Sequence, residues 1–218
     1  MRCFLLVQRR RFCTVGCVPL GLPAFMVWGS NTSVGKTIVS TGVASSFLQS
    51  DLHPRKFVYL KPIQTGFPSD SDSRYLFSKV LAMFSRFGSR SLVSSNAVAK
   101  ASMPACGRGG TGLFDLNFRE EVTRSGECGD GASVLRCETL YAWKEPVSAH
   151  LAAERESGPV EDSTVLSMLA SHLWKCMDGE DAKEAMCVIE TAGGVASPGP
   201  SGTLQCDMYR YRFLSVKR

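Results

Sequence analysis

A run of small and polar residues, set between an apolar stretch and a helical pattern, constrains the fold of this chain more than any other feature. Residues 24–28 are apolar and indicate a buried strand, and apolar residues from Ile38 to Phe47 recur at helical spacing. A strand, a glycine-bearing turn that ends in Gly-Lys-Thr and then a helix are the layout of a phosphate-binding loop. The sequence therefore predicts a nucleotide site at this loop, which reads Gly29-Ser30-Asn31-Thr32-Ser33-Val34-Gly35-Lys36-Thr37.

The chemistry of the loop follows from its small residues and from the helix behind it. Backbone N–H groups curl around a polyphosphate, and the helix N-terminus adds donors and partial positive charge. Lys36 would reach the outer phosphates and the Thr37 hydroxyl would hold Mg²⁺. The spacing departs from the usual pattern, because five residues rather than four separate Gly29 from Gly35. A chance glycine turn before a helix is the alternative, but Lys-Thr at this point has no obvious use in packing.

Length and charge limit the functional class. The chain has 218 residues, enough for one α/β domain, and no apolar run is long enough to span a bilayer. Its net charge is +5, and four arginines within the first eleven residues supply most of it. The remainder is nearly neutral, so we expect neither a nucleic-acid surface nor a membrane partner.

The N-terminal segment has the composition of a targeting sequence. Residues 1–23 are basic, and no Asp or Glu occurs before Asp51, as in a transit peptide. A secretory signal is the alternative, but Pro19, Gly21 and Pro23 interrupt its apolar stretch and the first predicted strand follows immediately. Because Ser and Thr are scarce here, we expect a mitochondrial location, with the plastid as the alternative.

The nine cysteines form no Cys-x-x-Cys pair and the three histidines do not cluster with them. A zinc site is therefore not predicted, and we interpret the cysteines as buried or free thiols in a reducing compartment. His172 is predicted to lie at the edge of the core, not to bind a ligand.

The remaining pattern alternates strands with helices. Apolar runs predict strands at 57–60 and 186–189, and amphipathic spacing predicts helices over 70–84 and 161–176. This order predicts a parallel sheet with helices on both faces and a ligand at the carboxyl ends of the strands. Residues 97–136 are glycine-rich and weakly periodic, so we expect a surface insertion or a partly disordered segment there.

Two further motifs follow predicted strands and would meet the phosphate loop at the same edge of the sheet. A carboxylate facing such a loop can hold Mg²⁺, and Asp70 or Asp72 could add a second. Each group has a simpler interpretation, as a solvated lysine, a turn cap or a helix-start acid. Their joint occurrence at strand ends favours a site. The motifs are Lys61-Pro62-Ile63-Gln64-Thr65-Gly66 and Glu190-Thr191-Ala192-Gly193-Gly194.

These three motifs, together with Tyr141-Ala-Trp-Lys-Glu-Pro-Val-Ser-Ala-His150, resemble dethiobiotin synthetase. The likeness covers about residues 24–206, interrupted by the insertion, and the five-residue gap between glycines is normal in that family. The N-terminus and the insertion resemble the plant version, which is fused to a diaminopelargonate aminotransferase. The resemblance implies a P-loop NTPase-like domain over 24–207 and a divergent basic tail over 208–218. The family continues with further elements, so we expect a sheet incomplete at its C-terminus and a weakly active or inactive chain.

The resemblance also implies a reaction and residue roles. The family carboxylates 7,8-diaminopelargonate with CO₂ and closes the ureido ring of dethiobiotin with ATP and Mg²⁺, as a homodimer. By position, Lys36 and Lys61 would be catalytic, and Thr37, Asp72 and Glu190 would hold Mg²⁺. Asp72 is preferred to Asp70 because Ser71-Asp72 aligns with a Ser-Asp pair of the family. The loop from Gly29 to Thr37 would bind the nucleotide, and the substrate-binding residues would be Thr32, Lys61, Thr65, Gly193 and Gly194.

Two other functions remain open at this stage. One is an ATPase switch of the partitioning or metal-insertase type, against which Lys61 argues because it suits a small carboxylated substrate. The other is a non-catalytic nucleotide-binding fragment.

Overall fold

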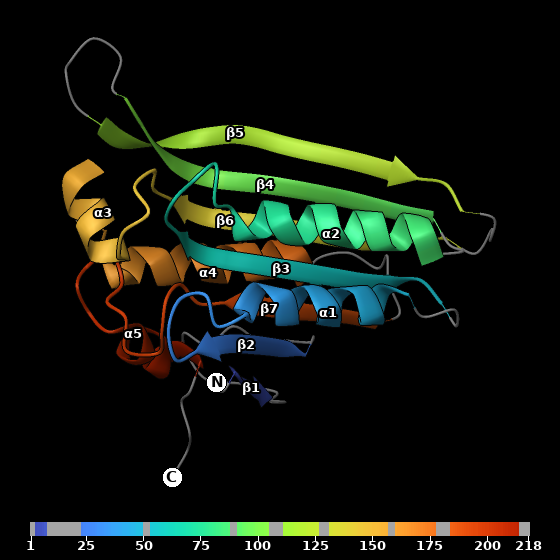
Figure 1. The fold of residues 1–218 in the computed structure, drawn as a ribbon, viewed down its shortest axis with the longest axis horizontal. Coiled ribbons are helices and arrows are strands. Elements are labelled where there is room, and N and C mark those ends of the chain that lie inside the picture. Colours follow the sequence, from blue (N-terminus) through green and yellow to red (C-terminus); the bar gives the residue numbers. More distant parts are fainter. Residues whose placement is uncertain are drawn as a thin grey trace.

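The computed structural model describes residues 3–7, 23–49, 53–87, 91–104, 111–126, 131–156, 160–177 and 184–213. They form one seven-stranded sheet between two layers of helices (Figure 1). The strand order is β1-β2-β7-β3-β6-β4-β5, parallel from β2 to β4 and antiparallel at both edges. The strands are β1 Cys3–Val7, β2 Ala24–Gly29, β3 Arg55–Gln64, β4 Ser91–Pro104, β5 Thr111–Arg124, β6 Ala132–Ala142 and β7 Glu184–Glu190.

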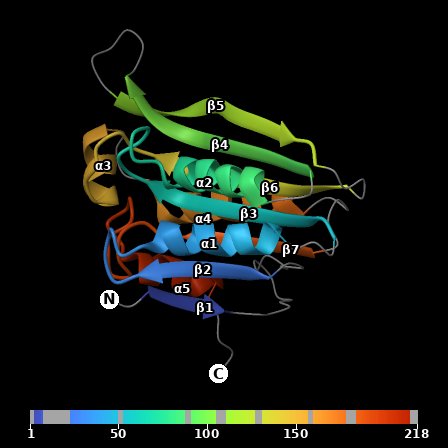
Figure 2. The same ribbon diagram turned by 45° about the vertical axis from the view of Figure 1, so that its right-hand side comes forward.

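Helices cover both faces of the sheet, as the alternating pattern predicts. In Figures 1 and 2, α1 and α2 lie over one face and α4 over the other, while α3 lies at the end where the parallel strands finish. The predicted strands at 24–28, 57–60 and 186–189 are confirmed as β2, β3 and β7. The helices are α1 Lys36–Leu48, α2 Asp72–Phe87, α3 Ala149–Glu156, α4 Asp162–Met177 and α5 Gln205–Phe213.

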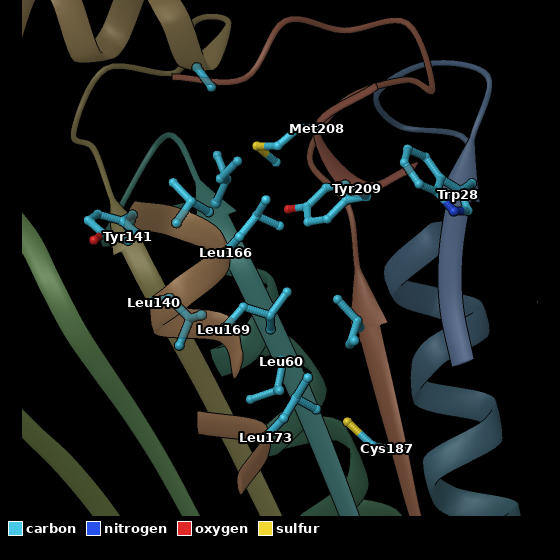
Figure 3. Close-up of a cluster of buried hydrophobic side chains, with 14 of the residues drawn as sticks. Trp28, Leu60, Leu140, Tyr141, Leu166, Leu169, Leu173, Cys187, Met208 and Tyr209 are labelled. Carbon is cyan, nitrogen blue, oxygen red and sulfur yellow. The ribbon is translucent and has the colours of Figure 1, made fainter. Parts of the chain in front are cut away.

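The helix α4 buries one face against the sheet. Figure 3 shows Leu166, Leu169 and Leu173 directed towards Leu60 of β3 and Leu140 of β6. Their three- and four-residue spacing places them on one stripe of the helix, which explains why the sequence predicts this element well. His172 lies half-buried at the edge of this core, where its Nδ1 is 2.5 Å from an oxygen of Glu138.

Where the structure describes residues 97–136, they form strands rather than the weakly ordered segment that their glycine content indicates. These residues contribute most of β4, all of β5 and the start of β6, and β4 pairs in register with β6 in the main sheet. At the start of β4, two of the buried residues are polar, Ser94 and Asn96, so the sequence of this strand lacks a clear alternation of apolar and polar residues. Much of the glycine falls within 105–110 and 127–130, between the strands and outside the described residues.

The N-terminal segment and α1 also differ from what their sequence patterns indicate. Cys3–Val7, within the segment whose composition resembles a targeting sequence, forms β1 and pairs antiparallel with β2. The apolar residues of α1 recur at helical spacing but do not all face the core, because Ile38 is 66% exposed while polar Ser40 and Ser45 are buried. The chain after 207 continues in α5, and Met208 and Tyr209 join the core (Figure 3); residues 214–218 lie outside the described part.

The described cysteine side chains behave as buried thiols. Cys137, Cys176 and Cys187 are buried and free, and Cys206 is free and half-buried. Burial raises the pKa of the Cys137 and Cys187 thiols well above the ordinary value, so both stay protonated at neutral pH. None of the described helices is both long and apolar enough to cross a membrane.

Candidate functional site

The phosphate loop joins β2 to α1 in the conformation that an anion-binding loop needs. Gly35 has φ +90°, a left-handed geometry that favours glycine, and Ser33 also lies at positive φ. Helix α1 begins at Lys36, so its first free N–H groups face the loop. The predicted strand, loop and helix arrangement is therefore present, and Gly35 supplies the turn that lets the helix start there.

Thr37 lies between two carboxylates that come from distant parts of the chain. Its Oγ1 is 2.9 Å from Asp72 Oδ1 and 2.8 Å from Glu190 Oε1. A hydroxyl has one proton, so it can donate to only one of these oxygens at a time. Three oxygen atoms thus crowd one point at the carboxyl end of the sheet, an arrangement that suits a cation.

Lys61 supplies a positive charge at the same point. The side chain is 3% exposed, and its Nζ is 2.6 Å from Asp72 Oδ2 and 3.1 Å from Glu190 Oε1. Burial acts to lower the pKa of this ammonium, but the charges of Glu190 and then Asp72 outweigh it and raise the pKa. Lys61 is therefore charged at neutral pH, and it is not the solvated strand-end lysine of the simpler interpretation.

Glu190 is the last residue of β7 and is fully buried. Its Oε1 contacts Thr37 and Lys61, and its Oε2 accepts a hydrogen bond from Ser40 Oγ at 2.8 Å. A buried carboxylate is tolerated only when it is paired and hydrogen-bonded, as this one is. Ser40 is a functional contact that the sequence analysis missed, and a polar residue one turn after Gly-Lys-Thr is the signal that could have found it.

Lys36 connects the phosphate loop to the loop after β7. Its Nζ donates to the carbonyls of Gly193 at 2.6 Å and Asn31 at 3.0 Å. The two loops touch so closely that a Cβ on Gly194 would lie 2.4 Å from the Ser30 carbonyl oxygen. Glycine is required at 194 because any side chain would push these backbones apart.

An open cavity of about 470 Å³ lies over these groups. The Asp72 carboxylate lies against Thr37 and Lys61, whereas Asp70 lines the cavity without contacting either of them. Gly29, Asn31, Val34 and Gly194 shape the loops without lining it, and Ile38, Gln64 and Tyr75 line it although the sequence analysis gave them no role. The predicted site residues that line it are Thr32, Ser33, Gly35, Lys36, Thr37, Lys61, Thr65, Asp72, Glu190 and Gly193.

The donor set fits magnesium. Mg²⁺ prefers oxygen ligands and usually takes one or two carboxylates, with waters and substrate phosphates completing its shell. Thr37, Asp72 and Glu190 present a hydroxyl and two carboxylates at the mouth of the phosphate loop. Among the described residues, no group of three or more His, Cys, Asp or Glu side chains is arranged to hold a metal ion.

Comparison with known proteins gives relatives but no match to a protein-family model. The chain is 49% identical over 205 residues to the mitochondrial bifunctional dethiobiotin synthetase/7,8-diamino-pelargonic acid aminotransferase of Arabidopsis thaliana. It is 48% identical over 202 residues to the protein of that name from Oryza sativa subsp. japonica. A bifunctional dethiobiotin synthetase/adenosylmethionine-8-amino-7-oxononanoate aminotransferase of Emericella nidulans is 29% identical over 189 residues.

The match covers most of this chain but only a small part of each plant relative. It covers 88% of this chain but only 24% and 23% of the two plant proteins. The fungal match covers 87% of this chain and 17% of that relative. The chain therefore spans about a quarter of the length of the plant relatives that it matches.

Proposed function

We propose that this chain, a homologue of the N-terminal domain of the bifunctional dethiobiotin synthetases, converts 7,8-diaminopelargonate, CO₂ and ATP to dethiobiotin, ADP and phosphate. It would act as a Mg²⁺-dependent cyclo-ligase of biotin biosynthesis. The observation that carries the proposal is the meeting of Lys61, Asp72 and Glu190 at Thr37 of the phosphate loop. The phosphate loop alone gives no role to a buried lysine at this point, whereas its ammonium suits a small carboxylated substrate.

The first chemical step builds a mixed anhydride. One amine of the substrate takes up CO₂ as a carbamate and loses a proton, and a carbamate oxygen then attacks the γ-phosphorus of ATP while ADP leaves. Lys36, at the start of α1, would neutralise charge on the transferring phosphoryl group, and Lys61 would hold the carbamate oxygen. Thr37, Asp72 and Glu190 would hold Mg²⁺, which when bound would supply positive charge to neutralise the phosphates in part.

The second step closes the ring. The neighbouring amine attacks the carbamate carbon, the bond from that carbon to the phosphate oxygen breaks, and the amine loses its proton. Lys61 is ion-paired on two sides, so its ammonium is held in place when charge develops on the leaving oxygen. Thr32 and Thr65 would hydrogen-bond the phosphates or the diamine, and the backbone at Gly193 and Gly194 would provide further contacts.

The setting of the activity is proposed from the relatives. Both plant relatives are named as mitochondrial, and we propose that location for this chain, with residues 1–23 as a transit peptide. Their names also join the synthetase to a diaminopelargonate aminotransferase, so the natural partner would be that domain, in a homodimer. The catalytic unit would be residues 24–207 with the tail 208–218.

The proposal is tested by incorporation of labelled bicarbonate into dethiobiotin by the full chain with Mg-ATP and diaminopelargonate. Lys36→Ala should abolish product, and Lys175→Ala, an exposed position on α4, should leave it unchanged. ATP hydrolysis that proceeds equally without diamine and bicarbonate, with no labelled product, would contradict the proposal and favour a switch-type ATPase.

A further inference from the structure

The buried amide of Gln64 joins the end of β3 to the start of α2. Gln64 is the last residue of β3 and is 5% exposed. Its Nε2 donates to the carbonyls of Asp70 at 2.7 Å and Thr65 at 2.8 Å, and its Oε1 accepts the N–H of Asp72 at 3.1 Å. The amide therefore makes all three of these bonds to the turn that leads into α2.

We infer that Gln64 is a positioning residue that fixes the Asp72 carboxylate at the proposed Mg²⁺ site, an inference that rests on the proposed function. Asp72 is the first residue of α2, where backbone N–H groups have no partner inside the helix. Gln64 Oε1 satisfies this N–H from outside the helix. The bond fixes the backbone of the residue whose carboxylate meets Thr37 and Lys61.

The four groups at the site differ in how they are held. Lys61 and Glu190 lie on parallel strands of the sheet and Thr37 lies in the first turn of α1. Asp72 is the first residue of α2 and follows an irregular turn, residues 65–71, so its backbone depends on contacts from outside the helix. Gln64 is a firm anchor because its backbone pairs with Ala142 of β6 and its carbonyl accepts the Trp143 N–H at 2.9 Å.

Other contacts hold this turn as far as Asp70, whose N–H donates to the Gly66 carbonyl at 2.9 Å. The Gly66 N–H donates to the Glu145 carbonyl, the Phe67 N–H donates to the Trp143 carbonyl, and Ser69 Oγ donates to the Gly66 carbonyl. None of these bonds reaches the Asp72 backbone. Removing the Gln64 amide should therefore leave the turn attached at its beginning but let its end, with Asp72, move.

The test measures ADP binding to the full chain by calorimetry over a range of Mg²⁺ concentrations. Gln64→Leu keeps the volume and removes all three bonds. Loss of a group that orients a metal ligand usually costs about 10–100-fold in metal affinity. We expect the Mg²⁺ concentration for half-maximal binding to rise at least about tenfold, with little change in ADP affinity at saturating Mg²⁺.

Gln205→Leu is the matched control. Gln205 is 1% exposed, and its amide likewise bonds the backbone of a site loop, accepting the Ala192 N–H and donating to its carbonyl. This variant loses a buried amide without touching Asp72, so its Mg²⁺ requirement should rise clearly less than that of Gln64→Leu. If Gln64→Leu does not fold, Gln64→Glu serves, because it keeps an acceptor for the Asp72 N–H and should raise the requirement less.

The outcomes separate the inference from the function on which it rests. An unmodified chain whose ADP binding is independent of Mg²⁺ would overturn both. A Mg²⁺ requirement that is present in the unmodified chain and unchanged in Gln64→Leu and Gln64→Glu would overturn the inference alone. An equal rise in Gln205→Leu would also overturn it, because general loss of packing would then explain the effect.

Discussion

Lys61 balances the negative charge of Asp72 and Glu190. Both carboxylates also lie within hydrogen-bond distance of the Thr37 hydroxyl. Removing one member of a buried ion pair typically destabilises a protein by about 3–5 kcal/mol, because the remaining charge is left uncompensated. We expect Lys61→Met to lower the free energy of unfolding by about 3 kcal/mol and to abolish product formation. Denaturant unfolding without metal measures the first effect.

The same variant tests whether the oxygen cluster accepts a divalent cation. With the ammonium gone, Mg²⁺ should compensate Asp72 and Glu190 and should raise the melting temperature more in Lys61→Met than in the unmodified chain. Lys36→Met is the comparison, because it leaves the Lys61 ion pairs intact. A Mg²⁺ effect of equal size in all three proteins would count against metal binding at these carboxylates.

Gly194 is the position where the site tolerates no side chain. A Cβ there would lie 2.4 Å from the Ser30 carbonyl oxygen, and two backbones would have to separate. We expect Gly194→Ala to lower the free energy of unfolding by about 1–3 kcal/mol and to weaken ATP binding. Gly42→Ala, within α1 and with open space around the new methyl group, should stabilise the chain by about 0.5–1 kcal/mol. Equal effects in thermal melts would refute the close-contact argument.

At the level of elements, the sequence predicts the site better than the sheet. Lys61 and Glu190 could be placed together because parallel strands end at one edge, and the Gly-Lys-Thr pattern located α1. The orientation of α1 could not be predicted, since packing beside the site buries Ser40 and leaves Ile38 exposed. The roles of Ser40 and Gln64 depend on such orientations, which residue spacing alone does not contain.

The strands that the sequence analysis missed are those with polar buried positions or weak apolar patterns. In β4, Ser94 satisfies its hydroxyl by donating to the Val122 carbonyl of β5, so a buried polar residue costs little there. Pairing of β4 with both neighbours compensates for its low apolar content. Tertiary partners of this kind lie far along the chain and outweigh local propensity.

The strand β1 gives a prediction at the same scale. It pairs only with β2 among the described strands, so removal of residues 1–23, as the proposed transit cleavage would require, exposes the backbone edge of β2. Because β2 keeps its parallel pairing with β7, the shortened chain should still melt cooperatively and bind ADP. Open strand edges favour association, so light scattering should show more concentration-dependent oligomers than for the full chain. Loss of cooperative melting would show that β1 is essential to the fold.

For the whole molecule, the two helical layers bury thiols on opposite faces of the sheet. Cys137 lies in the core under α1 and α2, and Cys187 lies in the core under α4 (Figure 3). Burial raises the pKa of both thiols well above their ordinary value of 9.0. The unfolded chain therefore loses these protons at a lower pH than the folded chain does.

The sign of the resulting pH dependence follows from proton linkage. A group whose pKa is higher in the folded state contributes stability that is full below its unfolded pKa and is lost as the pH rises above it. The free energy of unfolding should therefore fall as the pH rises above about 9. The double variant Cys137→Ala, Cys187→Ala should be less stable at neutral pH, because it leaves cavities, yet should lose less stability between pH 8 and pH 10. Denaturant titrations at fixed pH values measure this slope, and an equal slope in both proteins would mean that other groups control the alkaline transition.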